Sequence, residues 1–495
     1  MKERELKLAL PGRFTLPALD LGGAVTAESL PERVLRATYY DTSDLRLARH
    51  GVTLRYRTGD AGGPRWTVKL PVATTGSEVV RDEISFDGPQ REAPPEARSL
   101  VTAFARFEPL VAVATLRTRR RGLRLLGEDG PLAEIDDDEV SVIEGRRVVS
   151  RFRELEVEAL AEDLDLEALA TQLRRAGATD AEPIPKVVRA LGSRATAPPD
   201  VGAAGAAAET MGEVLGIAIA DALHRLVHHD PLARLGEVEG VHQVRVALRR
   251  LRSDLRTLAG AVDPAWRSQM EPRLRDVAEA LAAARDLDVL EASLARDAEG
   301  SRAALGPLFT MLDERRAEAR ARMRATLDDP GYVELIDALV DAVAAPPVGP
   351  DAGVAAADGM PRAVLDAWRR LARRADDLGQ RTPDEAFHRT RIAAKRVRYA
   401  AELAARVLPD REGDAAGKMA EMIAMLQDAL GTIQDAAVGE AAIRDSMRRG
   451  RVGSAHAFEA GRLVERQRMR AEDARRSFLA RWRRARRRRW RRWAT

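Results

Sequence analysis

Hydrophobic and polar residues alternate along most of the first 192 residues. Successive side chains of a β-strand point to opposite faces, so a period of two predicts strands with one apolar and one polar face. Eight strands are predicted, within residues 1–10, 39–42, 53–59, 65–71, 79–88, 114–126, 132–142 and 153–160. Gly- and Pro-containing turns separate them, and two helices are predicted at 97–107 and 165–178. This half is therefore expected to be an α+β domain, an eight-stranded antiparallel tunnel or barrel.

The pattern changes after residue 192. Residues 193–208 are small and Pro-containing without periodicity, which predicts a linker. Helical periodicity, rich in Ala, Leu, Arg and Glu, then runs through 209–480 and is interrupted at 344–362. The final segment, 481–495, holds nine arginines and no acidic residue. The sequence therefore predicts an all-α second domain in two parts, followed by an Arg/Trp-rich tail.

The two parts of the helical half repeat one motif, "VHQVRVALRRLRSDL" and "FHRTRIAAKRVRYAA". The matching positions are His242, Arg245, Arg249, Arg250 and Arg252 in the first copy and His388, Arg391, Lys395, Arg396 and Arg398 in the second, each pair 146 residues apart. Asp286 and Asp435 follow in a second pair of similar segments. This repetition predicts two copies of one helical bundle unit.

Composition narrows the functional classes. The net charge is +4, from 81 basic and 77 acidic residues, and the chain has no cysteine, which excludes disulfides and thiolate-bound metals. The first residues lack the basic-then-apolar pattern of a secretory leader, and the sequence has no apolar run of transmembrane length and no G-x-x-x-x-G-K-[S/T] phosphate loop. We therefore expect a cytoplasmic protein. Two interpretations of the tail remain open. Its tryptophans could stack or contact a membrane surface, or the tail could be the frayed basic end of a helix.

Charged residues share a single face on most of the predicted strands. These same-face sets are Glu3, Glu5 and Lys7; Arg55 and Arg57; Lys69; Arg81 and Glu83; Arg117, Arg119 and Arg121; Glu134, Asp136 and Asp138; and Glu154, Glu156 and Glu158. A charged face on a single strand is ordinarily a solvated surface. If the outside of the barrel is apolar and covered by helices, however, the charged faces of all these strands must point inward. Buried charges require partners, which water, a divalent ion and an anionic ligand supply. Carboxylates suit Mg²⁺, and arginines and lysines suit phosphate oxygens.

This order of motifs, beginning with E-x-E-x-K and continuing with "LRYR", "TVKL", "RDE" and "ELEVE", resembles the CYTH domains, the triphosphate tunnel metalloenzymes. The resemblance covers about residues 1–192 and implies a closed eight-stranded tunnel that hydrolyses triphosphates with Mg²⁺ or Mn²⁺. It implies metal-binding carboxylates at Glu3, Glu5, Asp136, Glu156 and Glu158. It implies phosphate-binding cations at Lys7, Arg55, Arg57, Lys69, Arg81, Arg117, Arg119 and Lys186. Of these two groups, Glu3, Glu5, Lys7 and Lys69 are expected to be catalytic. Arg121 and Asp138 remain alternatives for the arginine and aspartate roles.

The repeated motif places one histidine and three cations on a ridge of each helix, beside an apolar stripe. Such a ridge repels itself unless anions neutralise it, and either Asp286 and Asp435 or a long polyanion would do so. The pattern resembles the CHAD domain over about residues 209–480. That resemblance implies two pseudo-symmetric four-helix bundles whose basic central surface binds inorganic polyphosphate through all ten repeated His, Arg and Lys positions. Zinc binding by the histidines is less favoured, because no H-E-x-x-H or clustered His/Asp spacing accompanies them.

Together these patterns predict a metal-dependent triphosphatase joined to a polyphosphate-binding domain, located in the cytoplasm and associated with polyphosphate granules. The alternative is a non-catalytic polyphosphate-binding protein that holds chain ends in the tunnel. Nucleic acid binding through the tail accounts only for residues 481–495 and is not required. The sequence leaves open which triphosphate is the substrate and what the oligomeric state is.

Overall fold

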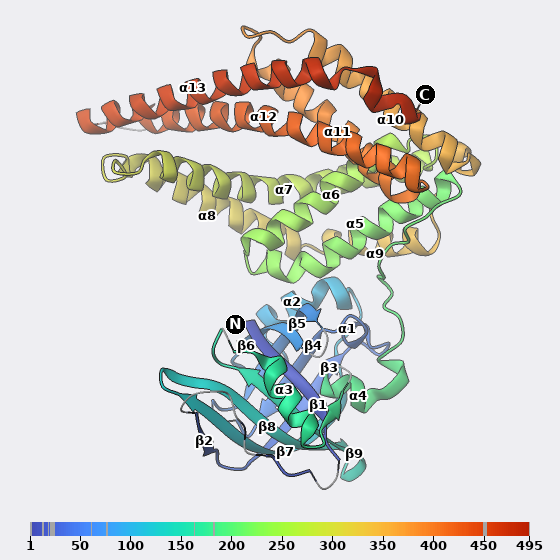
Figure 1. The fold of residues 1–495 in the computed structure, drawn as a ribbon, viewed down its shortest axis with the longest axis vertical. Helices are drawn as coiled ribbons and strands as arrows, with labels where there is room; N and C mark the ends of the chain where they lie inside the picture. The colour runs from blue at the N-terminus through green and yellow to red at the C-terminus, as the bar shows by residue number, and fades with distance from the viewer. Residues whose placement is uncertain are drawn as a thin grey trace. The chain divides into compact units, whose positions relative to one another are not determined.

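The computed structural model describes residues 2–11, 14–17, 19, 25–60, 62–75, 78–162, 164–181, 184–448 and 453–494. The side chains of residues 2–3, 72–75, 78–81 and 488–489 lie outside this description. The chain divides into two compact units, Met1–Asp200 and Val201–Thr495, the first rich in strands and the second helical (Figure 1). No helix in the described ranges combines the length and hydrophobicity needed to cross a membrane.

The described part of the first unit contains one antiparallel sheet of ten strands, where the sequence predicts eight. The strands are β1 (Lys2–Ala9), β2 (Thr26–Ser29), β3 (Arg33–Asp41), β4 (Thr53–Thr58), β5 (Arg65–Thr75), β6 (Glu78–Phe86), β7 (Val111–Gly127), β8 (Gly130–Glu144), β9 (Arg147–Ala159) and β10 (Thr179–Asp180). They pair in the order β10-β1-β6-β5-β4-β3-β7-β8-β9, and β1 also pairs with β9, which closes a ring from β1 to β9. Strand β2 lies off this path and pairs with β7. The prediction missed β2 and β10 because both are short and exposed and therefore lack a period-two pattern.

Alternation along β1 separates a buried apolar face from a polar one. Leu6 and Leu8 are fully buried in a core with Leu169 and Leu173 of helix α3 (Leu166–Arg175), which covers this side of the sheet (Figure 1). Because neighbouring side chains of a strand point oppositely, Glu5 and Lys7 of the same strand face the inside of the ring. Helix α2 (Pro95–Ala105) packs against β5 and against the short helix α1 (Arg46–Arg49).

Helix α4 (Lys186–Leu191) packs against residues that point into the ring. Its Val187 and Val188 share a core with Leu116 of β7 and Val140 of β8. Leu116 also lines the cavity enclosed by the strands. The helix therefore covers apolar side chains of the inner face and brings Lys186, its first residue, to the polar interior.

The predicted linker begins as a packed segment of the first unit. After the short helix η1 (Gly192–Arg194), Ala195 is buried in the core beside α4, and Asp200 lies 3.1 Å from Nε2 of His50. The guanidinium of Arg106 pairs with the other oxygen of Asp200, and the charges of His50 and Arg106 hold the pKa of Asp200 below its ordinary value despite burial, which raises it. Residues 193–200 therefore contribute to the stability of this unit.

We expect the fragment 1–200 to fold and to melt several degrees above the fragment 1–192. The shorter fragment lacks Asp200, the carboxylate that neutralises the buried side chain of Arg106. Losing one member of a partly buried ion pair costs about 2 kcal/mol, or about 4–8 °C in a domain of this size. Thermal melts followed by circular dichroism measure the difference, with Asp200→Asn in the longer fragment as the matched control. Equal melting temperatures for all three proteins would show that residues 193–200 add nothing.

The second unit contains nine α-helices within its described residues. They are α5 (Met211–Arg234), α6 (Val238–Thr257), α7 (Pro264–Asp297), α8 (Gly306–Asp328), α9 (Pro330–Ala344), α10 (Ala356–Asp376), α11 (Asp384–Val407), α12 (Asp410–Arg448) and α13 (Ser454–Ala485). Five precede and four follow the break between α9 and α10, which carries the short helix η2 (Pro350–Gly353). Helix α10 begins at Ala356, within the segment predicted to be a break, and Pro361 lies inside it.

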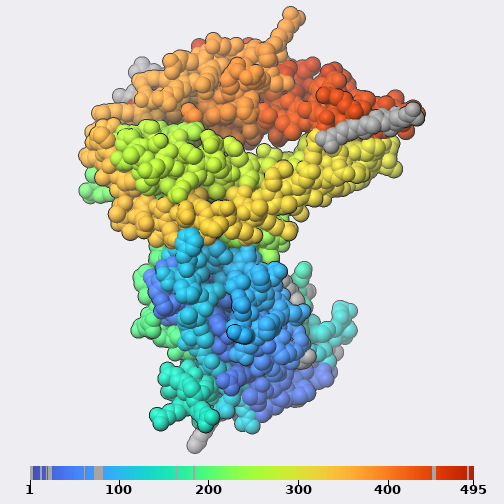
Figure 2. Space-filling view, turned by 180° about the vertical axis from the view of Figure 1, so that it is seen from behind, coloured from blue at the N-terminus to red at the C-terminus, as the bar shows by residue number. Residues whose placement is uncertain are grey.

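Consecutive helices pack against each other in each half, and α6 of the first half packs on α11 of the second. Away from this crossing, Leu308 and Leu312 of α8 share a core with Ile443 of α12 and Leu463 of α13. Figure 2 shows, from behind, a hollow that separates the yellow residues of the first half from the orange-red residues of the second along part of their length. The two sequence repeats are thus in contact through α6 and α11, the helices that carry the repeated motif.

The Arg/Trp-rich tail folds back on α10. Trp482 of α13 is buried and stacks on Trp368, with ring centroids 5.4 Å apart, and its indole N–H donates to Asp376 at 2.9 Å. The guanidinium of Arg491, in the short helix η3 (Arg488–Ala494), lies 4.5 Å from the Trp368 ring. These side chains therefore have an intramolecular packing role.

Candidate functional sites

The ring of strands in the first unit encloses a polar cavity of about 430 Å³. Residues from each of the eight ring strands, together with Lys186 of α4, line it. The lining residues that carry charge are Glu5, Lys7, Arg55, Arg57, Arg65, Lys69, Glu83, Arg120, Asp136, Asp138, Glu156, Glu158 and Lys186. Four of the seven cations lie on β4 and β5, and five of the six carboxylates lie on β1, β8 and β9.

One part of the wall, on β4, β5 and β6, is mainly basic. Arg55 and Arg57 alternate on β4, and Lys69 on β5 lies 2.8 Å from Glu83 on β6. Burial raises the pKa of Glu83, but Lys69 and Arg55 outweigh it and bring that pKa to about 2. Glu83 therefore stays ionised and holds Lys69 in place. At the end of β4, Arg57 pairs with Asp60, and its pKa is lowered by the neighbouring Arg55 and by burial.

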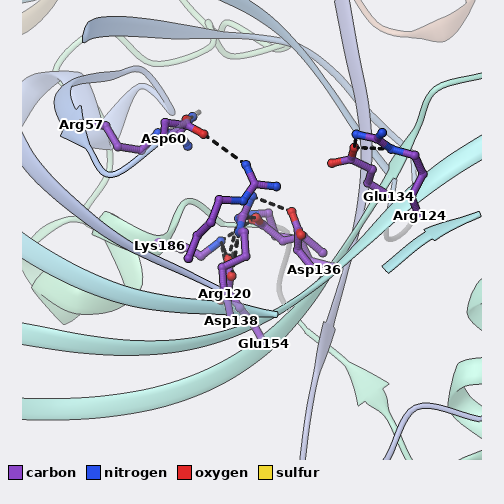
Figure 3. A network of polar contacts seen from close by, with 12 residues as sticks. Arg57, Asp60, Arg120, Arg124, Glu134, Asp136, Asp138, Glu154 and Lys186 are labelled. Carbon is purple, nitrogen blue, oxygen red and sulfur yellow. Dashed lines mark hydrogen bonds and ion pairs between the residues drawn. The ribbon is translucent and has the colours of Figure 1, made fainter. Parts of the chain in front are cut away.

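The opposite part of the wall, on β8, β9 and β1, is mainly acidic, and three cations reach into it (Figure 3). Nζ of Lys186 lies 2.9 Å from Asp138, 3.1 Å from Glu154 and 2.6 Å from Glu156. The guanidinium of Arg120 lies 2.5 Å from Asp136, 2.6 Å from Asp138 and 3.0 Å from Glu156. Nζ of Lys7 lies 2.6 Å from Glu156. The carboxylates of this wall are thus neutralised by the protein's own cations.

Burial and charge have opposing effects on these groups. Burial alone would lower the pKa of Lys186, but Asp138 and Glu156 outweigh it and hold that pKa well above its ordinary value. Likewise, Lys186 and Lys7 overcome the effect of burial on Glu156 and hold its pKa well below the ordinary range. Asp136 differs, because burial raises its pKa to about 6 even though Arg120 opposes the rise. The surroundings of Asp136 therefore compensate its negative charge only in part.

Most of the site residues that the sequence predicts for the tunnel meet in this cavity. These are Glu5, Lys7, Arg55, Arg57, Lys69, Asp136, Glu156, Glu158 and Lys186. The side chains of Glu3 and Arg81 lie outside the described residues, and their backbones are register partners on β1 and β6. Sequence reasoning gave Asp138 only as an alternative and missed Arg120, and it recognised Glu83, the partner of Lys69, only as part of a charged face. Glu154, buried beside Lys186, was recognised only as part of a charged face.

Arg117 and Arg119 were expected to face the tunnel and bind phosphate there, but their side chains do not line the cavity. Both side chains are exposed on the other face of β7, and Nε of Arg119 donates to Glu32 at 2.7 Å. The inward position belongs to Arg120, because the register pairs it with Asp138, which lines the cavity. Five consecutive charged or polar residues, 117–121, hide the alternation on this strand. Asp136 and Asp138 of the partner strand share the inward face, but only the register of β7 with β8 transfers that parity to Arg120.

The side chains of the acidic wall have the chemistry needed to bind a hard divalent cation. All are carboxylate oxygens, the ligands that Mg²⁺ and Mn²⁺ prefer, and Oδ1 of Asp136 is buried without a hydrogen-bond donor among the described residues. No three acidic or histidine side chains in the described ranges already converge on one metal position. The residues available for a metal are Glu5, Asp136, Glu156 and Glu158, with Glu3 outside the described side chains.

In the helical unit, four of the predicted cations form a central group where α6 meets α11. The group is Arg245, Arg249, Arg391 and Lys395. Burial lowers the pKa of Lys395, and the positive charges of Arg391, Arg249 and Arg245 lower it further, to about 7. Arg249 lies over the ring of Tyr399, with its guanidinium 5.6 Å from the centroid. This central group repels itself unless an anion neutralises it.

Internal carboxylates neutralise only part of the central group. Arg245 lies 3.4 Å from Asp286, whose side chain is 66% exposed. Asp435 is near Arg391 and Lys395, but burial raises its pKa, so its negative charge is not strongly held. Among the described residues, Arg249, Arg391 and Lys395 form no ion pair within 4.0 Å. Internal ion pairing therefore neutralises Arg245 but not the other three cations of the central group.

The remaining predicted residues are placed around the central group rather than in it. Nδ1 of His388 donates to Gln434 at 2.7 Å, and burial lowers the pKa of His242. Arg250 and Arg398 both face Glu402, at 3.4 and 2.6 Å, and are neutralised there. Arg252 and Arg396 lie in a third, separate set of arginines, which is described below.

Two family models match the chain. The CYTH domain model matches residues 1–187, and the CHAD domain model matches residues 217–444. The uncharacterized protein Rv2226 of Mycobacterium tuberculosis is 30% identical over 416 residues, which cover 77% of this chain and 78% of the relative. The order of the two matched domains agrees with the order of the strand-rich and helical units.

Solved structures with similar parts were also found. PptA from Streptomyces chartreusis is 23% identical with a TM-score of 0.47, covering 56% of this chain and 100% of that one. The CHAD domain from the plant Ricinus communis is 25% identical with a TM-score of 0.44, covering 56% and 94%. A putative adenylyl cyclase from Hippeastrum, described as having a dominant triphosphatase activity, is 18% identical with a TM-score of 0.25, covering 38% and 94%.

Proposed function

The chain belongs to the proteins that join a CYTH domain to a CHAD domain, and from this premise we propose a function for each unit. The strand-rich unit hydrolyses inorganic triphosphate, or another triphosphate, with Mg²⁺ or Mn²⁺. The helical unit binds inorganic polyphosphate. The observation that carries the first part is the cavity wall, in which a basic side and an acidic side face one enclosed space of about 430 Å³.

The basic side is suited to hold a phosphate chain. Arg55, Arg57 and Lys69 present guanidinium and ammonium groups, which bind phosphate oxygens through charge-assisted hydrogen bonds. Glu83 positions Lys69 and, with a pKa of about 2, keeps its own charge at neutral pH. These residues would fix the chain so that its terminal phosphorus is held in one orientation.

The carboxylates of the acidic side are suited to exchange their present partners, Lys186 and Arg120, for a metal ion when substrate enters. Lys186 and Arg120 neutralise Asp138 and Glu156, and both cations reach the cavity. A triphosphate would draw these two cations toward its oxygens and free the carboxylates for the metal. A bound Mg²⁺ or Mn²⁺ would offset negative charge on the phosphate chain. Positioning and charge neutralisation of this kind supply most of the acceleration of phosphoryl transfer.

The test of the catalytic proposal is a phosphate-release assay on the full chain. Tripolyphosphate, thiamine triphosphate and nucleoside triphosphates are supplied in turn with Mg²⁺, with Mn²⁺ and with a chelator. We expect metal-dependent phosphate release from at least one of them. Binding of tripolyphosphate without release under every condition would reject the enzyme and support the alternative, a tunnel that only holds chain ends.

The central group of Arg245, Arg249, Arg391 and Lys395 supports polyphosphate binding by the helical unit. Its cations are partly buried and gathered from two helices, and an extended polyanion would remove their mutual repulsion. A covalent tether between this unit and the tunnel raises the local concentration of phosphate chains near the catalytic cavity.

Polyphosphate binding is expected to weaken as the pH rises above about 7. Lys395 has a pKa of about 7, and a bound polyanion favours its charged form, so binding above this pH requires proton uptake. One linked proton changes the apparent affinity by up to about tenfold per pH unit. Calorimetric titration in buffers of different ionisation enthalpy measures the protons taken up. Lys395→Arg keeps its charge throughout and should bind with the same affinity from about pH 7 to about pH 9.

A further inference from the structure

The two repeated helices carry opposite charges at one pair of equivalent positions, Arg256 on α6 and Glu402 on α11. Arg250 on α6 faces Glu402 on α11 at 3.4 Å, and Arg398 faces the same carboxylate at 2.6 Å. The repeat offset of 146 residues relates Arg250 to Arg396 and Glu402 to Arg256. The second location therefore has an arginine where the first has the neutralising acid.

At this second location, arginines from three helices come together. We call the set Arg252, Arg256, Arg370, Arg374 and Arg396 the Arg256 cluster. Arg252 and Arg256 belong to α6, Arg396 to α11, and Arg370 and Arg374 to α10, and these three helices pack on one another. Burial lowers the pKa of Arg396, and the charges of Arg256, Arg370 and Arg374 lower it further.

Carboxylates do little to neutralise the cluster. Glu271 lies 3.4 Å from Nε of Arg256, and this is the one ion pair that the described residues supply to the five arginines. Nε of Arg252 is buried and has no hydrogen-bond acceptor among the described residues. Arg252 and Arg396 are half-buried, and Arg256, Arg370 and Arg374 are exposed. Guanidinium groups gathered in this way around a single ion pair are the arrangement expected where an external anion completes the structure.

The cluster continues the central group along α6. Arg245, Arg249, Arg252 and Arg256 recur at spacings of three and four residues, which places them on one stripe of the helix. At about 1.5 Å per residue, the stripe from His242 to Arg256 is roughly 20 Å long. An extended chain of phosphates can follow such a stripe, whereas a triphosphate is too short to occupy both ends.

We propose that the Arg256 cluster is a second phosphate-binding subsite, which takes the phosphoryl groups of an inorganic polyphosphate chain that extends past the central group on one side only. This rests on the proposed polyphosphate binding of the helical unit. The ligand is a polyphosphate rather than a nucleic acid because the cluster consists of guanidinium groups alone. Single-stranded nucleic acids also require aromatic side chains for base stacking.

The variant Arg256→Glu tests the subsite, because it places at this location the acid that the other repeat already has. Arg396 and Arg252 would then be neutralised as Arg250 and Arg398 are by Glu402. We expect an unchanged or higher melting temperature and about tenfold weaker binding of long-chain polyphosphate by the full chain. The dependence of the logarithm of affinity on that of salt concentration should flatten by about 0.7 for each phosphate that the variant no longer neutralises.

The matched control is Arg322→Glu, an equal charge reversal on α8 at a side chain that is 64% exposed. It should bind long-chain polyphosphate as the unmodified protein does. If Arg256→Glu and Arg322→Glu bind alike, the subsite is rejected while polyphosphate binding stands. If the unmodified protein binds no long chain, the proposed function of the helical unit itself fails. A single-stranded oligonucleotide that binds as tightly as polyphosphate and is equally weakened by Arg256→Glu would overturn the choice of ligand.

Discussion

Glu5→Gln is expected to reduce metal-dependent phosphate release by at least about a hundredfold while the protein stays folded. Glu5 is 3% exposed and lines the acidic side of the cavity, where its carboxylate is one of the groups available for a metal. The amide has the same shape but no negative charge, so the loss should be electrostatic rather than steric. Lys7 keeps a close carboxylate partner in the variant, because Glu156 lies 2.6 Å from it.

The measurement is initial phosphate release over a series of Mg²⁺ and Mn²⁺ concentrations, with a thermal melt of each protein. Glu139→Gln is the matched control, since Glu139 is on β8 but faces outward beside Arg121. It should retain full activity. Unchanged turnover of Glu5→Gln at limiting metal would reject the assignment of Glu5 to the metal. A lower melting temperature in Glu5→Gln alone would show that the carboxylate is structural.

Arg249→Glu combined with Lys395→Glu is expected to remove long-chain polyphosphate binding. The two positions are equivalent in the repeat and both belong to the central group, so the double change replaces two positive charges with two negative ones. Each phosphate that the variant no longer neutralises also keeps its counterions, so the favourable free energy of releasing them no longer contributes to binding. The combined loss should be at least about a hundredfold at physiological salt, measured by calorimetric titration.

Thermal melts of the same double variant separate binding from internal structure. Internal pairing of these cations with Asp286 and Asp435 would make the variant melt early. Because Arg249 and Lys395 form no ion pair among the described residues, we expect no loss of stability. Arg322→Glu with Arg324→Glu, on the exposed face of α8, controls for the change in net charge. A double variant that melts early and still binds long polyphosphate would contradict the central group as the binding surface.

Local pattern was sufficient for much of the first unit. The alternation of Leu6 and Leu8 with Glu5 and Lys7 predicted a strand with an apolar outside and a charged inside, and the structure places these residues in that way. The helices at 97–107 and 165–178 correspond to α2 and α3. Periodicity works here because alternate side chains of a strand share one face, so burial of that face appears as a period of two in the sequence. The same reasoning could not find β2, which is exposed throughout.

Strand parity on β7 required tertiary information. Arg117, Arg119, Arg120 and Arg121 are chemically equivalent in sequence, and no local signal shows which of them faces inward. A shift of one residue exchanges the two faces of a strand, so the choice depends on the register with β8, where Arg120 is opposite Asp138. The pairing of Lys69 with Glu83 likewise follows from the contact of β5 and β6.

Composition and periodicity were enough to predict the two kinds of domain, the repeat and the residue types suited to phosphate chemistry, because they record which faces of each element are buried. Only the tertiary structure divided the repeated cations into different groups. Arg250 and Arg398 are neutralised by Glu402, whereas Arg252 and Arg396 lie beside Arg256, although all four occupy matching positions of one motif. The physical reason is that the charge environment of an arginine depends on the helices packed against its own, and α6, α10 and α11 meet only in the folded chain.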